Sequence, residues 1–145
     1  MIDQLDHAIL RILTNDGRRT QREIGVEVGL SANAVGARVN RLIERGIITG
    51  IHAKVDHAKL GRSMEVTIDI WREERSEPES MERVVSDDDR ITECFYLTGP
   101  LDFRLRAIVA SADDLNDLLN RLKTEANVRQ TDSRIVLEHL EVPAS

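Results

Sequence analysis

Two helix-start signals that lie eleven residues apart, with a glycine between them, constrain this chain more than any other feature of its sequence. Thr20 and Glu23 form a capping box, because the Thr20 hydroxyl can accept from the Glu23 backbone N–H while the Glu23 carboxylate accepts from the Thr20 N–H. Gly29 can end the helix that starts there, since glycine adopts the left-handed cap conformation without a Cβ penalty. Ser31, a strong N-cap residue, can then start the next helix almost at once. The spacing predicts a helix-turn-helix, in which a tight glycine turn joins two short helices.

Apolar residues at helical spacing add one helix before this pair and give each of the three helices a buried side. The added helix ends at the turn signal Asn15-Asp16-Gly17, and the last helix ends at Gly46. The apolar positions are Leu5, Ile9, Leu10, Ile12 and Leu13 in the first helix, Ile24 and Val28 in the second, and Val35, Val39, Leu42 and Ile43 in the third. A plain three-helix bundle that binds another protein is the alternative.

The polar side of the last helix is where a helix-turn-helix protein meets DNA, because the second helix of the pair enters the major groove. Asn33 can pair with adenine edges, and Arg38 or Arg41 can bind guanine or phosphate. Two alternatives stay open: Arg38 forming an ion pair with Glu27 or Glu44, and Asn33 only supporting the helix cap. The candidate DNA-binding residues are Thr20, Gln21, Ser31, Asn33, Ala34, Ala37, Arg38 and Arg41.

Two glycines in this part of the chain need an explanation of their own. Gly50 lies among β-branched residues, which predicts two short strands over residues 47–56, a hairpin of the kind called a wing. Gly36 lies inside the last helix, where glycine costs roughly 1 kcal/mol relative to alanine. Either a close approach of the DNA backbone or tight packing against the first helix would account for Gly36.

The rest of the chain alternates between strand and helix patterns. Residues 64–71 alternate apolar and polar side chains, as a half-exposed strand does, and Thr98-Gly99-Pro100-Leu101 is a tight-turn signal. We predict strands over residues 64–71, 91–97, 102–110 and 128–142, and helices over residues 80–85 and from Ala112 onwards. The order β-α-β-β-α-β is the ferredoxin-like pattern, with both helices on one face of a four-stranded sheet. The other face needs cover, and a second copy of the chain is the simplest cover, so we expect a homodimer.

The charge is divided unevenly between these two parts of the chain. Residues 1–60 contain nine Lys and Arg against seven Asp and Glu, a net charge of +2, whereas residues 61–145 contain eleven against nineteen, a net charge of −8. Such asymmetry indicates that the two parts have different jobs, with the basic part suited to a nucleic acid.

Other function classes lack the residues that they need. No apolar run approaches the ~18 residues of a membrane span, the N-terminus has no signal-peptide pattern, and a single cysteine cannot form an internal disulfide, so we expect a cytoplasmic protein with no membrane partner. P-loop, GxSxG, CxxC and HExxH motifs are absent, so we expect neither an enzyme nor a bound metal or cofactor. We interpret Cys94 as a small core residue. The scattered histidines are interpreted as surface residues: His7, His52, His57 and His139.

Several short motifs, in their order and spacing, resemble the Lrp/AsnC family of bacterial and archaeal regulators, also called leucine-responsive or feast/famine regulators. They are Leu5-Asp6-x-x-Ile9-Leu10, Gly17-Arg18, Gly29-Leu30-Ser31, Arg38-Val39-x-x-Leu42, Gly46-Ile47-Ile48-x-Gly50, Leu60-Gly61, Glu93-Cys94, Thr98-Gly99-x-x-Asp102-Phe103 and residues 131–138. We therefore expect an α+β fold with a winged helix-turn-helix domain over residues 1–56, a hinge over 57–62, and a ferredoxin-like effector-binding and dimerisation domain over 63–145. The resemblance also implies that homodimers assemble into octamers, as tetramers of dimers, and control genes of amino-acid metabolism or transport.

The resemblance further implies an amino-acid effector, bound between subunits near the turn after the second strand. The residues of this site would be Thr98, Gly99, Pro100, Leu101, Asp102, Thr131 and Ser133. Asp102 can accept from the ligand ammonium, the hydroxyls can donate to its carboxylate, and Gly99 lets the ligand approach the backbone. The alternative is a plain hairpin turn, with Asp102 paired to Arg104 or Arg106 of a neighbouring subunit.

Departures from the family pattern bear on which effector this would be. Pro100 and Leu101 replace residues that are often acidic and aromatic, and Ile51 stands where the wing often has tyrosine. Arg104 and Arg106 share a strand face with Asp102, which favours an acidic or polar ligand side chain. The sequence thus predicts a transcription regulator that binds specific sites on double-stranded DNA and responds to an amino acid or related metabolite. A chromosome-organising architectural protein, with little sequence preference and no ligand, is the alternative.

Overall fold

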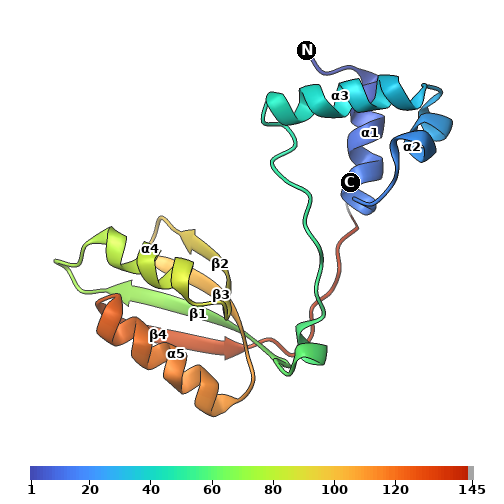
Figure 1. Ribbon diagram of the computed structural model, residues 1–145. Helices are drawn as coiled ribbons and strands as arrows, with labels where there is room; N and C mark the ends of the chain where they lie inside the picture. Colours follow the sequence, from blue (N-terminus) through green and yellow to red (C-terminus); the bar gives the residue numbers. More distant parts are fainter. Residues whose placement is uncertain (144–145) are drawn as a thin grey trace. The chain divides into compact units, whose positions relative to one another are not determined.

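The computed structural model describes residues 1–143, which form two compact units (Figure 1). The first unit comprises Met1–Lys54 and the C-terminal segment from Leu140, and the second comprises Val55–His139. The elements are α1 (Gln4–Asn15), α2 (Gln21–Val28), α3 (Ala32–Glu44), a 3₁₀ turn (His57–Leu60), β1 (Met64–Arg72), α4 (Pro78–Asp87), β2 (Ile91–Tyr96), β3 (Phe103–Val109), α5 (Ala112–Glu125) and β4 (Val128–Ile135).

The first unit is a three-helix fold held together by a small aliphatic core. Ile9 of α1, Ile24 of α2 and Val35 of α3 are buried against one another. The capping box at Thr20 is formed as predicted, and Gly29 ends α2 with a φ of +74°, in the left-handed conformation expected of it. Ser31 caps α3 through its hydroxyl. Local hydrogen bonding thus fixes the helix-turn-helix at the residues where the sequence predicts it.

The two strands predicted over residues 47–56 are not formed. This segment follows Gly46, which has a φ of +69°, and contains no strand. A two-residue hairpin turn needs a residue with positive φ at its centre, and Gly50 is not in that conformation. The segment is therefore an extended connection, and Ile51, expected in the wing, packs its Cγ2 atom above Gly17 instead.

The second unit is a four-stranded antiparallel sheet with strand order β2-β3-β1-β4. Figure 1 shows α4 and α5 together on one face of this sheet. Alternate residues of the two central strands point to the helices and form the core: Val66, Ile68, Ile70, Phe103, Leu105, Ala107 and Val109, packed with Met81, Val84, Leu118 and Leu122 of the helices. The ferredoxin-like β-α-β-β-α-β fold predicted from the sequence is confirmed.

The sheet face opposite the helices carries ion pairs at its centre, beside apolar side chains such as Phe95 and Ile108. Asp69 at its centre is 4 % exposed and pairs with Arg104 at 2.6 Å and with Arg134 at 2.9 Å. The Arg104 guanidinium holds the pKa of the Asp69 carboxyl below its usual value, against the opposing effect of burial. Arg106 pairs with Glu65 and Glu93. The charges on this face are thus largely satisfied within one chain, and the homodimer stays a prediction.

Several expected boundaries and one expected core residue differ in the structure. β4 ends at Ile135 rather than at residue 142, because β1 begins at Met64, only two residues before Val66, the partner of Ile135, and the one further bond runs from the Val136 N–H to the Glu65 carbonyl. The contacts divide the chain after Lys54 rather than after residue 56, and they group the segment from Leu140 with the first unit, where Glu141 pairs with Lys54. Cys94 is exposed, not buried, because β2 is an edge strand.

No helix within residues 1–143 is both long enough and apolar enough to cross a membrane. The same residues contain no cluster of three or more His, Cys, Asp or Glu side chains that could hold a metal ion.

Candidate DNA-reading surface and effector site

The starts of α2 and α3 use two of the predicted DNA-binding hydroxyls as caps. Thr20 Oγ1 accepts from the Glu23 backbone N–H at 3.2 Å, and Ser31 Oγ accepts from the Ala34 N–H at 3.1 Å. The backbone N–H of Thr20 donates to the Glu23 carboxylate, which lowers the pKa of Glu23. Both hydroxyls therefore position helices, and any phosphate contact at these sites would use the helix N-termini, where backbone N–H groups favour anions.

One face of α3 is free for DNA. Asn33, Ala37 and Arg41 are exposed and follow one another at four-residue spacing, so they form a row along the helix. Asn40 is also exposed and belongs to the same row, seven residues after Asn33. We had not singled out Asn40 from the sequence, although its spacing from Asn33 is the signal that could have identified it. Ala34, another predicted contact, is only partly exposed at the edge of this row.

Arg38 does not belong to this free row. Its guanidinium forms ion pairs with Asp3 at 2.7 Å and with Asp6 at 2.9 Å, and its side chain is 20 % exposed. These two aspartates are the capping box at the start of α1, where each carboxylate accepts from the backbone N–H of the other residue. The Arg38 guanidinium in turn lowers the pKa of Asp3. Arg38 thus does form ion pairs, but with neither Glu27 nor Glu44, and it joins α3 to the beginning of α1.

Replacing Arg38 with alanine should therefore destabilise the first unit, because Asp6 would keep a nearly buried carboxylate without its cation. We expect the thermal midpoint of the full chain to fall by at least about 4 °C. Arg41→Ala is the matched control, since Arg41 is exposed and forms no ion pair within the described residues. Equal midpoints for the two variants, measured by circular dichroism, would contradict a structural role for Arg38.

Gly36 lies next to the Gln21 side chain of α2, and no atom of α1 is among its three nearest neighbours. A Cβ atom at this position would lie 2.8 Å from Gln21 Oε1 and 2.9 Å from Gln21 Nε2. The Gln21 side chain, a predicted DNA contact, therefore lies across the backbone of α3 where the two helices meet. A larger residue here would displace the Gln21 amide from this position.

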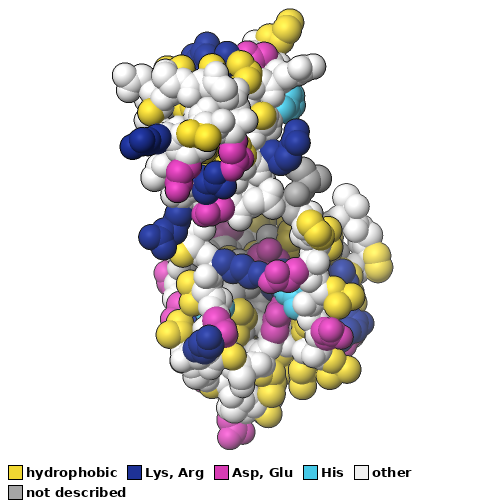
Figure 2. Space-filling view, turned by 90° about the vertical axis from the view of Figure 1, so that its right-hand side faces the viewer, with side chains coloured by type: hydrophobic (Ala, Val, Ile, Leu, Met, Phe, Trp, Pro, Cys, Tyr) yellow, Lys and Arg dark blue, Asp and Glu magenta, His cyan; other side chains and the backbone are white. Residues whose placement is uncertain are grey.

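Five arginines of the first unit are exposed and form no ion pair within residues 1–143: Arg11, Arg18, Arg22, Arg41 and Arg45. Arg19, by contrast, is paired with Glu27 and Glu23. Figure 2 shows basic and acidic side chains interspersed on the face in view rather than one continuous basic patch. The unpaired arginines are therefore the cations that could meet phosphates without first giving up a partner.

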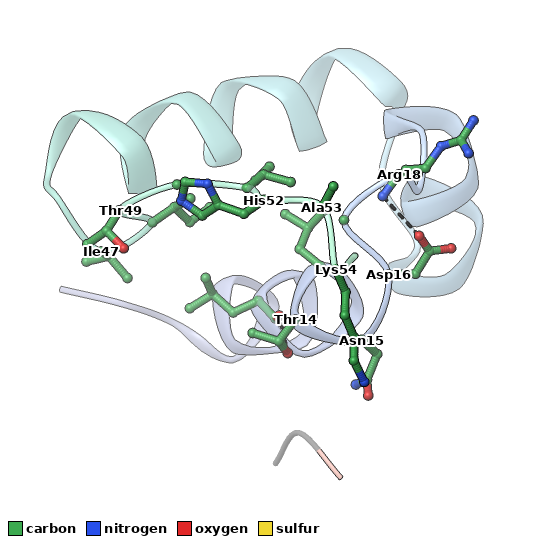
Figure 3. A pocket seen from close by; sticks show the side chains of 15 residues that line it. Thr14, Asn15, Asp16, Arg18, Ile47, Thr49, His52, Ala53 and Lys54 are labelled. Atoms are coloured by element: carbon green, nitrogen blue, oxygen red, sulfur yellow. Dashed lines mark hydrogen bonds between the residues drawn. The ribbon is translucent and has the colours of Figure 1, made fainter. Parts of the chain in front are cut away.

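A cavity of about 800 Å³ lies in the first unit, and Arg18 is among the residues that line it. It opens between the end of α1, the turn after it, and the extended segment 47–54 (Figure 3). In Figure 3, Thr14 and Asn15 lie on the α1 side, and Thr49 and His52 lie on the opposite side. None of the predicted DNA-binding or effector-binding residues lines it, so the cavity belongs to neither candidate site.

The predicted effector turn follows β2 at one end of the sheet. Gly99 has a φ of +110°, a conformation that favours glycine. Asp102 is held by the neighbouring strand, since its carboxylate accepts from the Arg72 backbone N–H at 2.8 Å and its own N–H donates to the Ile70 carbonyl. Thr98 and Pro100 are exposed, and Leu101 is partly exposed. Asp102 thus anchors the turn to the end of β1, and only one of its two oxygens is used.

Thr131 and Ser133 lie on β4, with β1 between them and the effector turn. Thr131 is opposite Ile70 in the β1–β4 ladder, and Ile70 is opposite Phe103 on the other side, so Thr131 and the turn share one end of the sheet about 10 Å apart. Ser133 lies two residues further along. Within one chain, the turn residues 98–102 and the β4 residues Thr131 and Ser133 therefore lie at the same end of the sheet but are not in contact.

Arg104 and Arg106 are not available to a ligand in the way we had expected. Both are committed to carboxylates of their own chain on the sheet face opposite the helices, Arg104 to Asp69 and Arg106 to Glu65 and Glu93. The expectation that they favour an acidic ligand therefore loses its basis. The same pairs also occupy the arginines that the plain-turn alternative would have given to Asp102.

A buried ionic cluster in the second unit was missed from the sequence. Asp88, with a 3 % exposed side chain, binds Arg90 at 2.7 Å and Arg121 at 3.1 Å, and Arg90 also reaches Asp114 and Asp117 of α5. Hydrogen bonds from Arg90 lower the pKa of Asp88 to about 2, and they outweigh the effect of burial. The cluster joins the end of α4 and the start of β2 to α5, and its role is structural.

Acid should weaken this cluster. Because the pKa of Asp88 falls from 3.8 to about 2 on folding, its contribution to stability is present above pH 4 and is lost as the pH falls through 2. The shift corresponds to about 2 kcal/mol. Urea unfolding between pH 5 and pH 2 should show a smaller loss of stability in Asp88→Asn than in the wild-type chain. Identical pH dependence in the two proteins would contradict this assignment.

Comparison with known proteins identifies the two parts of the chain as known kinds of domain. Residues 2–49 match a family model for winged helix-turn-helix DNA-binding domains, and residues 64–142 match the Lrp/AsnC ligand-binding domain. The chain is 35 % identical over 136 residues to the transcriptional regulator LrpA of Mycobacterium tuberculosis, covering 94 % of this chain and 90 % of that protein. It is 29 % identical to the regulatory protein AsnC of Escherichia coli, covering 96 % and 92 % of the two chains.

Solved structures give the same result for the whole fold. A feast or famine regulatory protein of M. tuberculosis, in complex with L-methionine, superposes with a TM-score of 0.91 and 32 % identity, over 100 % of this chain and 98 % of the other. Both halves of the chain and their order are thus shared with DNA-binding regulators that carry a ligand-binding domain. The chain belongs to the Lrp/AsnC family of transcriptional regulators.

Proposed function

We propose that this chain regulates transcription by binding specific DNA sites through α3 and that an amino acid, bound at the effector turn, changes its DNA binding. The exposed row of Asn33, Ala37, Asn40 and Arg41 carries the first part of this proposal. Amide and guanidinium groups on one exposed helix face are suited to base edges in the major groove. The N-termini of α2 and α3 and the unpaired Arg18 and Arg22 would bind the phosphates on either side.

The effector part rests on the match to the ligand-binding domain and on the geometry of the turn. The regulator from M. tuberculosis that was solved with L-methionine shares this fold at 32 % identity. In the present chain, Gly99 has no side chain and so leaves room for a ligand at the turn. The carboxylate oxygen of Asp102 that does not bind Arg72 N–H is available as a hydrogen-bond acceptor. Thr131 and Ser133 would join the effector turn in one binding site through another subunit, or through a ligand that spans the end of the sheet. The genes controlled would be those of amino-acid metabolism or transport.

Footprinting of the DNA upstream of the protein's own gene, with and without each of the twenty amino acids, tests the proposal. A bounded protected site that one amino acid strengthens, weakens or shifts is the expected result. Uniform coverage with a steep dependence on salt would instead indicate the architectural alternative, because phosphate contacts alone carry no sequence information. A bounded site that no amino acid alters would support the DNA-binding part and contradict the effector part.

Self-association belongs to the same proposal. We propose a homodimer that assembles further into an octamer, with a second copy facing the sheet face of Asp69, Arg104 and Arg106. Light scattering of the full chain at micromolar concentration is the test. A monomer under these conditions would contradict the proposed dimer and leave the DNA-reading residues unaffected.

A further inference from the structure

Arg72, at the end of β1, has two buried guanidinium nitrogens with no hydrogen-bond acceptor among residues 1–143. Its guanidinium carbon lies 5.3 Å from the centre of the Phe103 ring and 5.8 Å from the centre of the Tyr96 ring. The two rings contact each other, with centres 5.0 Å apart. The Nε and Nη1 atoms of Arg72 are buried, and no group within the described residues accepts a hydrogen bond from either.

Buried donors without acceptors are rare, because they lose their hydrogen bonds to water and gain none in return. The other partly buried arginines of this unit, Arg62, Arg90, Arg106 and Arg121, are all paired with carboxylates. The aromatic rings explain what holds the Arg72 guanidinium in place, but they do not satisfy its N–H groups. A guanidinium that is held in position and left unpaired is suited to an anion from outside the chain.

The position of Arg72 identifies the site to which this anion would belong. Tyr96 and Phe103 are the residues on either side of the effector turn, and the Asp102 carboxylate accepts from the backbone N–H of Arg72 itself. This nearby carboxylate thus binds the backbone of Arg72 and does not neutralise its side chain. The unpaired cation therefore lies at the turn where the proposed amino acid would bind.

We propose that Arg72 binds the carboxylate of the amino-acid effector, while the free oxygen of Asp102 accepts from its ammonium group. This inference rests on the proposed effector function and adds the residue that recognises the acid group. Guanidinium and carboxylate groups form charge-assisted pairs in a fixed geometry, so the two residues together select a zwitterion. Because Tyr96 is 71 % exposed, its ring can turn aside at small cost in packing and uncover the guanidinium when the ligand enters.

Calorimetry on the full chain at about pH 6, where an α-ammonium is charged, tests this assignment. The probes are the amino acid that binds most tightly among the twenty and its α-carboxamide, which keeps the ammonium and side chain but lacks the negative charge. The variants are Arg72→Met, Arg72→Lys and, as a control, Arg83→Met, which removes an exposed arginine of α4. Arg72→Lys keeps the positive charge and serves if Arg72→Met does not fold.

We expect Arg72→Met to weaken binding of the amino acid about 10- to 100-fold and to leave binding of the carboxamide unchanged. Arg72→Lys should have an intermediate effect, and Arg83→Met none. If Arg72→Met or Arg72→Lys weakens both probes equally, or neither, then Arg72 does not bind the carboxylate, and this inference fails while the proposed effector function stands. If the wild-type chain binds none of the twenty amino acids, the effector function itself fails, and the role of Arg72 fails with it.

Discussion

Replacing Arg90 with methionine is expected to lower the free energy of unfolding of the second unit by about 3 kcal/mol. Arg90 has a 12 % exposed side chain and connects Asp88 to Asp114 and Asp117. Without it, the almost fully buried Asp88 would retain Arg121 as its one cationic partner among the described residues, together with the hydrogen bond from the backbone N–H of residue 90. The Asp88 carboxylate would then be buried with too little positive charge around it, which costs more than the ion pair itself contributes. Urea unfolding of the full chain at pH 7, followed by circular dichroism, measures this loss.

Arg83→Met provides the comparison for this experiment, since it removes the same positive charge from an exposed position of α4. We expect its unfolding midpoint to stay close to that of the wild-type chain. A loss of less than about 1 kcal/mol in Arg90→Met would show that Arg121 alone can support Asp88. The cluster would then be a set of weak surface pairs and not a buried network.

Placing a carboxylate on the reading face should abolish specific DNA binding. Ala37 is exposed at the centre of the α3 row, between Asn33 and Arg41. In Ala37→Glu, the added negative charge would face phosphates and base edges, and such like-charge contacts cost several kcal/mol. We expect the affinity for the footprinted DNA to fall at least about 100-fold while the fold is kept. Fluorescence anisotropy with a labelled duplex gives the affinity, and circular dichroism checks the fold.

Ala112→Glu is the matched control, because Ala112 is an exposed alanine at the start of α5 in the other unit. It makes the same change in net charge, and a carboxylate is well tolerated in the first turn of a helix. Similar losses of affinity in both variants would mean that net charge, and not the α3 face, controls DNA binding. An unchanged affinity in Ala37→Glu would remove α3 from the interface.

Features that depend on neighbouring residues could be predicted from the sequence. The capping box of Thr20 and Glu23 closes over three residues, and Gly29 and Ser31 act through their own backbone and side chain. The alternation in β1 likewise follows from its two faces, one against the helices and one against the ion pairs. Such local patterns predict the order of helices and strands, and that order in turn predicts the fold of each unit.

Features that depend on distant residues could not be predicted in this way. Arg38 meets Asp3 and Asp6, which precede it by more than thirty residues, so its sequence neighbours Glu27 and Glu44 were the wrong candidates. The end of β4 is set by where β1 begins, and the exposure of Cys94 by the place of β2 at the sheet edge. For the effector site, a sequence shows which residues carry charge but not which charges already have partners, so it could reveal neither the unpartnered nitrogens of Arg72 nor the ion pair of Arg104 with Asp69.

The ion pairs on the open sheet face have a consequence for how the protein responds to its surroundings. A second copy that docks there must remove water from Asp69, Arg104 and their neighbours, whose charges are already balanced within one chain. The gain from such docking is modest and depends on electrostatics, which dissolved ions screen. DNA binding is weakened by the same ions, because they compete for the phosphates. If the proposed dimer docks through this face, a rise in salt concentration would therefore loosen the dimer and weaken its DNA binding together, without any change in the concentration of an effector.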